Sequence, residues 1–211
     1  MQGARKVMGL DWSYELPPKA IREGFQCRES SCAEFYRGEA ERFYTIGAAS
    51  VITAWKSPKH DEVAGFITIS PNGLRGNKYR KAIESVLGPA YSMGDKAFPC
   101  WFIGQLARAD DPELKGLGSR LLWLAIMDIV ERAHHGAGSC IMIEAERRRL
   151  VDFYMQFDFL PLHPALEHWK EPTETNQSGK MLLYLPIKQA KDIIQQAGLL
   201  DNPPVQTELP L

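Results

Sequence analysis

The stretch ELKGLGSRLLWLAIM, residues 113–127, places two glycines one residue apart directly before a long apolar run. From Leu117 to Ala133 the apolar residues recur at helical spacing, which predicts an amphipathic helix. The N-terminus of a helix leaves its first N–H groups unpaired and carries a partial positive charge. Glycines let an anion approach those groups closely. The stretch is therefore interpreted either as a phosphate cradle or as a turn that enters a buried helix.

Two better-known phosphate loops do not fit this stretch. The Walker A loop requires the pattern G-x-x-x-x-G-K-[ST], which the chain lacks. The dinucleotide fingerprint G-x-G-x-x-G requires a glycine where Leu121 stands. The spacing therefore favours neither a nucleotide hydrolase nor a nicotinamide-dependent oxidoreductase.

Strands are expected on both sides of this helix, over residues 100–109 and 139–145. A strand–helix–strand crossover joins parallel strands. The other expected elements are a helix over 30–40, an antiparallel hairpin of 50–56 and 62–70, helices over 77–88 and 148–157, a strand over 180–187, a short helix after Gln189, and irregular segments over 1–20, 89–99 and 161–179. This order predicts an α/β or α+β fold with a mixed central sheet flanked by helices.

The composition is that of an ordinary soluble globular protein. The 211 residues are 45% hydrophobic and 24% charged, with a formal net charge of −1. The length suits a single domain over 1–211, with a core at about 45–187, an N-terminal extension at 1–20 and a C-terminal tail at 188–211. No apolar run approaches the roughly 20 residues that span a bilayer, and no signal peptide is apparent. We therefore expect a cytoplasmic protein with no membrane partner.

The four cysteines and five histidines form no spacing typical of a metal site. Neither a C-x-x-C pair nor an H-E-x-x-H motif is present. Cys140 lies in an apolar run and is expected to be a core thiol. No metal is expected.

Three segments, in this order and at this spacing, resemble the acetyltransferases of the GNAT superfamily: IGQLARADDPELKGLGSRLLWLAIMDIV (103–130), SCIMIEA (139–145) and VDFYMQFDFLPL (151–162). That family has a strand, a pyrophosphate loop of the form [QR]-x-x-G-x-[GA], a helix, a second strand and an F-Y-x-x-x-G-F segment. FQCRESSCAEFYRGEA (25–40) and QLARADD (105–111) further resemble the toxin branch of the superfamily. The resemblance covers about residues 45–187 and implies a GNAT fold.

The resemblance implies an N-acetyltransferase that uses acetyl-CoA as cosubstrate. The backbone of Leu106 and Arg108, with Ala107 between them, would pair with the pantetheine arm and polarise the thioester carbonyl. Tyr154 would be the general acid that protonates the departing CoA thiolate. The pyrophosphate would be held by the backbone amides of Leu114, Lys115, Gly116, Leu117, Gly118 and Ser119.

The chain departs from the family pattern at three positions. Glu113 stands where the loop has Gln or Arg, so its carboxylate must point away from the pyrophosphate or weaken acetyl-CoA binding. Arg108 replaces a valine on the strand, which changes the floor of the site while its backbone still serves. Asp158 replaces the glycine of the G-F turn, and Asp tolerates the left-handed conformation better than most residues.

Several assignments keep two interpretations. Tyr154 either donates a proton or only packs among the phenylalanines around it. Glu144, at the end of a strand, either accepts a proton from the amine or is a solvated or paired carboxylate. The basic residues either form an RNA-binding face or are a solvated surface balanced by acids, and they are Lys56, Lys59, Arg75, Lys78, Arg80, Lys81 and Arg147, Arg148 and Arg149.

The acceptor is expected to be a primary amine of a small molecule, a protein or an aminoacyl-tRNA. The toxin-like features favour aminoacyl-tRNA and imply an antitoxin protein as a partner, and a homodimer is a further possible assembly. An alternative from another class is a non-catalytic acyl-CoA-binding or interaction module.

Overall fold

The computed structural model describes residues 5–7, 10–74, 84, 97–134, 138–162, 169–171 and 179–196. Contacts divide the chain into two compact units. The first unit comprises residues 1–70, 103–128 and 193–211, and the second comprises 71–102 and 129–192. The single domain expected from the length stays a prediction, and each unit is described by itself below.

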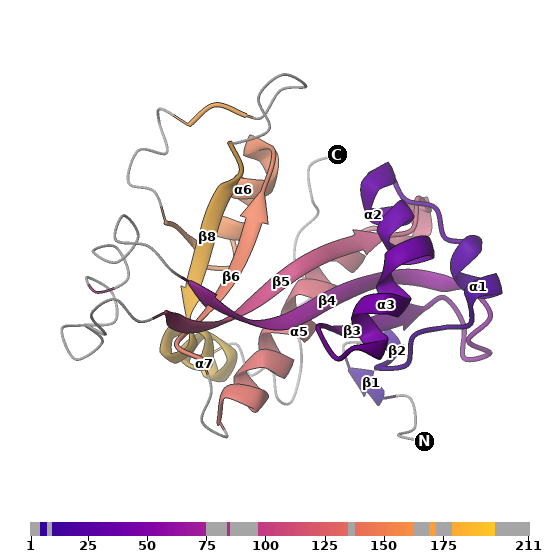
Figure 1. Ribbon diagram of the computed structural model, residues 1–211, viewed down its shortest axis with the longest axis horizontal. Helices are drawn as coiled ribbons and strands as arrows, with labels where there is room; N and C mark the ends of the chain where they lie inside the picture. The colour runs from indigo at the N-terminus through magenta and orange to yellow at the C-terminus, as the bar shows by residue number, and fades with distance from the viewer. Residues whose placement is uncertain are drawn as a thin grey trace. The chain divides into compact units, whose positions relative to one another are not determined.

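The strands of the first unit follow the order β1-β2-β3-β4-β5 (Figure 1). Their bounds are Arg5–Val7 for β1, Leu10–Ser13 for β2, Ser50–Trp55 for β3, Val63–Leu74 for β4 and Phe98–Arg108 for β5, the last two running on into the second unit. The pairs from β1 to β4 are antiparallel, which confirms the predicted hairpin of β3 and β4.

The sequence predicted an irregular N-terminal extension. This segment instead adds two strands, β1 and β2, to the sheet. In β2, Trp12 lies opposite Ala54 of β3 and is only 4% exposed. Burial of the Trp12 side chain removes a large apolar area from water, and the resulting free energy stabilises β2. The strand itself is too short to show an alternating sequence pattern.

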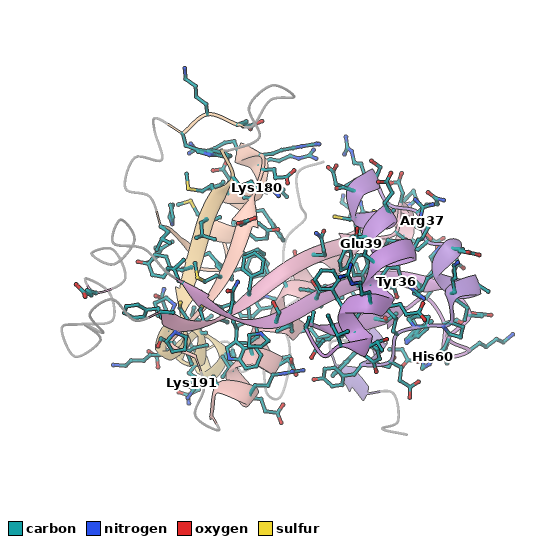
Figure 2. All side chains as sticks on the ribbon, viewed as in Figure 1. Tyr36, Arg37, Glu39, His60, Lys180 and Lys191 are labelled. Carbon is teal, nitrogen blue, oxygen red and sulfur yellow. The ribbon has the colours of Figure 1, made fainter. Side chains whose placement is uncertain are left out.

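Helical segments cover one face of β3 and β4 in this unit (Figure 1). They are α1 (Lys19–Glu23), α2 (Ser30–Glu34), the π-helical segment η1 (Phe35–Glu39) and α3 (Ala40–Thr45). The helix expected over 30–40 is therefore present and continues to Thr45. Tyr36 points inward from η1 and stacks on Phe66 of β4 with ring centroids 4.1 Å apart (Figure 2).

The helix α5 (Leu117–His134) confirms the helix predicted from the apolar spacing over 117–133. Successive residues of a strand face opposite sides of the sheet. Phe66 faces the helical segments, so Gly65 faces the other side, where a Cβ atom would come within 2.9 Å of Leu121 Cδ1 on α5. The sheet of the first unit is thus covered by helices on both faces.

The strands of the second unit follow the order β5-β6-β8-β7, and β6 and β7 each pair antiparallel with β8. The elements are β6 (Cys140–Ala145), α6 (Arg148–Met155), β7 (Leu160–Pro161), β8 (Met181–Pro186) and α7 (Ile187–Gln196). β5 and β6 are neighbours that the chain joins through α5, and the sheet is mixed, as the sequence predicted. The strands predicted over 139–145 and 180–187 and the helix predicted over 148–157 are confirmed.

The structure differs from two of the sequence predictions, and others fall outside the described residues. The short strand β7 ends at Pro161, inside the segment 161–179 where a loop was expected, because two residues are too few to show a period. β5 begins at Phe98, inside the expected loop over 89–99. Apart from Glu84, the helix expected over 77–88 lies outside the described residues, as do most of the loops expected over 89–99 and 161–179. Within the part of the chain that the structure describes, no helix is long and apolar enough to cross a membrane.

Candidate functional site

The C-terminal half of β5 presents alternate amides to its two edges. Toward β4, the Gln105 N–H donates to Thr68 Oγ1 (2.8 Å) and the Ala109 N–H donates to the Ala64 carbonyl (2.7 Å). Because N–H groups alternate along a strand, the Leu106 and Arg108 N–H groups point to the opposite edge of β5. These are the two residues whose backbone the family resemblance assigns to the pantetheine arm.

Gly65 keeps this part of β5 close against β4. A Cβ atom at position 65 would lie 2.7 Å from the Ala107 carbonyl oxygen and 3.2 Å from Arg108 Cα. Real Cβ atoms do not approach a backbone oxygen so closely, so only glycine fits without a shift of the strand. Gly65 therefore fixes the position of Ala107 and Arg108, a role that the sequence analysis missed because it depends on the pairing of two strands.

A network of charged groups fixes the loop that follows β5. The Arg108 guanidinium donates to the Ala109 and Asp111 carbonyls at 3.2 and 3.1 Å. The Asp111 carboxylate accepts from the Glu113 N–H at 2.9 Å and lies 3.1 Å from Lys56 Nζ. The Glu113 N–H and then the Lys56 ammonium hold the pKa of Asp111 below its ordinary value. The Arg108 side chain thus lies along the loop that follows β5, and its charged guanidinium binds the carbonyls of that loop.

The loop enters α5 through a 3-10 turn (Pro112–Leu114, η3) and a glycine in the left-handed region. Gly116 has φ +79°, which few other residues adopt without strain. The Arg120 N–H makes the first bond of α5, to the Gly116 carbonyl (3.3 Å). The N–H groups of Leu117, Gly118 and Ser119 therefore belong to the first turn, where a helix offers its amides no acceptor of its own.

Two of the six amides assigned to the pyrophosphate are already engaged. The Leu114 N–H donates to the Asp111 carbonyl at 3.1 Å, and the Lys115 N–H donates to the Pro112 carbonyl at 3.3 Å. The 3-10 turn causes this, because its i→i+3 bonds use the amides just before the helix. The cradle over Leu114–Ser119 stays a prediction, and the amides of Gly116–Ser119 lie beyond these two bonds. Glu113 is exposed and lies in the turn.

Tyr154 and the turn after it belong to the second unit. Tyr154 is on α6, is 6% exposed, and lies 5.3 Å from the Phe153 ring and 6.2 Å from the Phe159 ring, measured between centroids. Its carbonyl accepts from the Phe157 N–H (2.9 Å) and the Phe159 N–H (3.3 Å), which closes the turn. Asp158 has φ +61°, so the left-handed conformation predicted for this position is confirmed.

Glu144 lies in an exposed setting on β6 in the same unit. Its carboxylate is 3.9 Å from Lys180 Nζ, and Glu146 is closer to that ammonium, at 2.6 Å. Figure 2 shows Lys180 beside the start of β8. With its side chain 44% exposed, Glu144 has the features of the solvated, paired carboxylate.

Two of the five basic residues of this set that the structure describes, Lys56 and Arg148, are paired with acids. Lys56 contacts both Glu62 and Asp111, and Arg148 Nε lies 3.0 Å from the Asp152 carboxylate. These contacts favour the interpretation of a solvated surface over an RNA-binding face. Arg75, Lys78, Arg80 and Lys81 lie outside the described residues. Within the described ranges, no three His, Cys, Asp or Glu side chains gather as metal ligands.

No protein-family model matches the chain. Among solved structures, it is similar to a bacterial toxin, with a TM-score of 0.68 and 13% identity over 88% of this chain and 94% of that one. It is equally similar to AtaT complexed with acetyl-methionyl-tRNAfMet, with a TM-score of 0.68 and 16% identity over 88% of this chain and 99% of that one. The chain also matches the KacTA–DNA complex, with a TM-score of 0.62 and 15% identity over 89% of this chain and 99% of that one.

These matches extend over nearly the whole length of both chains. They show that the chain has the fold of the GNAT acetyltransferase toxins AtaT and KacT. The fold implied by the sequence resemblance is therefore confirmed.

Proposed function

We propose that the protein is a toxin-type N-acetyltransferase that moves an acetyl group from acetyl-CoA to a primary amine. The observation that carries this proposal is the placement of two sets of amides in the first unit. The N–H groups of Leu106 and Arg108 point to the edge of β5 away from β4, and the chain then returns through Gly116 into the first turn of α5. Structures of AtaT with acetyl-CoA, on the same fold, support this assignment.

The Leu106 and Arg108 amides suit the thioester end of acetyl-CoA. The acceptor amine attacks the thioester carbonyl, and negative charge develops on the oxygen before the C–S bond breaks. Fixed N–H donors stabilise that oxyanion because they need no reorientation as the charge forms. The packing of Gly65 against Ala107 keeps these donors in place.

The amides of Gly116–Ser119 suit the pyrophosphate. An anion at the start of α5 takes several N–H groups at once and the favourable end of the helix dipole. Because Glu113 is exposed and its N–H is bound by Asp111, we assign its side chain to solvent rather than to the phosphate.

Tyr154 is proposed as the proton donor to the CoA thiolate. A phenol with a pKa near 10 can share or give its proton to a thiolate whose thiol has a pKa near 8.5. Variants of both AtaT and KacT with phenylalanine in place of a tyrosine have been crystallised, which supports a test of this residue. Glu144 as the base stays a prediction, and an amine that arrives neutral needs no base.

The proposed acceptor is the amino group of an aminoacyl-tRNA, and the proposed regulator is an antitoxin protein. AtaT has been solved with acetyl-methionyl-tRNAfMet and with the C-terminus of the antitoxin AtaR, and these relatives support both assignments. A small-molecule or protein amine is the alternative acceptor. A cytoplasmic location and a homodimer complete the proposal.

Incubation with labelled acetyl-CoA and a mixture of aminoacyl-tRNAs tests the function. We expect label on the α-amino group of the aminoacyl ester, released with the amino acid after mild alkali. Label on lysine peptides or polyamines instead would assign the alternative acceptor. Binding of acetyl-CoA with transfer to none of these acceptors would favour a non-catalytic acyl-CoA-binding module.

A further inference from the structure

Two buried thiols of the second unit lie on neighbouring strands. Cys100 of β5 is 4% exposed, and Cys140, the first residue of β6, is fully buried. The Ser139 N–H donates to the Pro99 carbonyl at 2.8 Å, which places the residues before the two cysteines side by side. Both thiols are reduced and belong to one apolar cluster with Phe98, Met142, Leu162 and Tyr184.

The spacing of adjacent strands suits a bond between these sulfurs. Neighbouring strands lie about 4.7–4.9 Å apart, and a disulfide needs its two Cα atoms roughly 4.4–6.8 Å apart. The spacing of neighbouring strands therefore falls within the range that a disulfide spans.

The two thiols also interact with each other. The hydrogen bond from the Cys140 thiol lowers the pKa of Cys100, although burial opposes this effect. The same hydrogen bond, together with burial, raises the pKa of Cys140. Cys100 is thus the first of the pair to become a thiolate, and Cys140 remains the protonated partner. A thiolate next to a thiol is the arrangement from which disulfides form.

The other two cysteines lack this arrangement. In the first unit, the Cys27 thiol donates to the Glu29 carbonyl at 3.0 Å and the Cys32 thiol donates to Gln105 Oε1 at 3.1 Å. Each of these sulfurs faces an oxygen acceptor. The contrast distinguishes the Cys100–Cys140 pair from the remaining thiols of the chain.

We propose that Cys100 and Cys140 form a redox modification site, at which hydrogen peroxide links β5 to β6 through a disulfide. The Cys100 thiolate attacks one peroxide oxygen, the O–O bond breaks, and hydroxide leaves and is protonated to water. Cys140 then attacks the sulfur of the sulfenic acid as it gives up its proton. The S–S bond forms, the S–O bond breaks, and a second water leaves. Two thiols lose two electrons and one peroxide becomes two waters.

Peptide mapping of the full-length protein after peroxide treatment tests this proposal. Free thiols are alkylated under denaturing conditions before digestion, and Met155, 40% exposed, reports the effective dose as its sulfoxide. We expect a cross-linked peptide joining Cys100 to Cys140 at a dose that oxidises Met155, and its loss after dithiothreitol. The link should persist in the Cys27→Ala/Cys32→Ala double variant and be absent from Cys100→Ala and from Cys140→Ala.

Three results would overturn the proposal: both thiols fully alkylated after Met155 is oxidised, Cys100 found as a sulfinic or sulfonic acid without a cross-link, or a link between Cys27 and Cys32 alone. The wild-type map decides the outcome even if an alanine variant folds poorly. Because the readout uses no acetyl-CoA, its failure leaves the proposed function untouched.

Discussion

Different interactions stabilise two regions of the molecule, the loop from Ala109 to Ser119 in the first unit and the segment from Val151 to Phe159 in the second. Residues 110–116 of the loop are exposed or half-buried and include four charged side chains, and the loop is fixed by directional contacts such as the Arg108–Asp111 bond and by the φ of Gly116. The segment around Tyr154 is fixed by apolar packing. A substitution in the loop should therefore act through conformation and charge, whereas a substitution around Tyr154 should act through packing unless it removes only the phenol hydroxyl.

The removal of that hydroxyl should give the largest effect. Tyr154→Phe keeps the ring and its contacts with Phe153 and Phe159, so only the proton donor is lost. General acid catalysis typically contributes about 100-fold or more to a rate, so we expect turnover to fall by that factor, with acetyl-CoA affinity within about twofold of wild type. Steady-state kinetics with an aminoacyl-tRNA measure this change in turnover.

Tyr184→Phe, which removes the hydroxyl of another buried tyrosine of the second unit, is the matched control. Equal turnover in the two variants would make Tyr154 a packing residue.

A methyl group at Gly65 should disturb the strand that carries the loop. The added Cβ would lie 2.7 Å from the Ala107 carbonyl, and overpacking of this kind costs about 1–3 kcal/mol. We expect Gly65→Ala to lower the urea midpoint of unfolding and to weaken acetyl-CoA binding. At Gly38, a Cβ would meet nothing within 4 Å, so Gly38→Ala should leave both properties close to wild type. Equal midpoints for the two variants would show that Gly65 is not needed for close packing.

The loop itself is tested by its backbone conformation. Gly116 has φ +79° and open space around its would-be Cβ, so Gly116→Val introduces strain without a clash. Strained backbone of this kind costs roughly 1–3 kcal/mol, so we expect the KM for acetyl-CoA to rise about tenfold with kcat little changed. Gly116→Asn should stay near wild type because Asn tolerates the left-handed region. The same KM for both variants would contradict a role for this conformation.

The ionic network of the loop should give the smallest effect. The pKa of Asp111 is held down by the Glu113 N–H and by Lys56, so its contribution to stability is present above the ordinary pKa of about 4 and is lost as the pH falls through the lower folded value. Asp111→Asn keeps an acceptor for the Glu113 N–H and removes the charge. We expect the unfolding temperature of this variant to lie slightly below wild type at pH 7 and to converge with it in acid. Asp110→Asn, an exposed neighbour, should show no such convergence, and an Asp111→Asn difference that is independent of pH would refute the charge effect.

Local sequence signals predicted the helix α5, the strands around it and the left-handed Asp158, because spacing and residue type dictate these features locally. The involvement of the Leu114 and Lys115 amides in a 3-10 turn was not predicted, because Pro112 and Glu113 fit several loop conformations. The roles of Gly65 and Lys56 depend on which residues β4 and β5 bring together, and no local pattern carries that information. Trp12 in β2 shows the same limit, because its burial depends on a partner strand about 40 residues away along the chain.

Calorimetric titration of the full chain with acetyl-CoA tests the central claim most directly, since every step of the proposed reaction needs this cosubstrate on the amides of the first unit. The account predicts saturable binding of one acetyl-CoA per chain, weakened about tenfold by Gly116→Val and close to wild type in Gly116→Asn. The absence of any binding heat, or equal affinity in all three proteins, would contradict it.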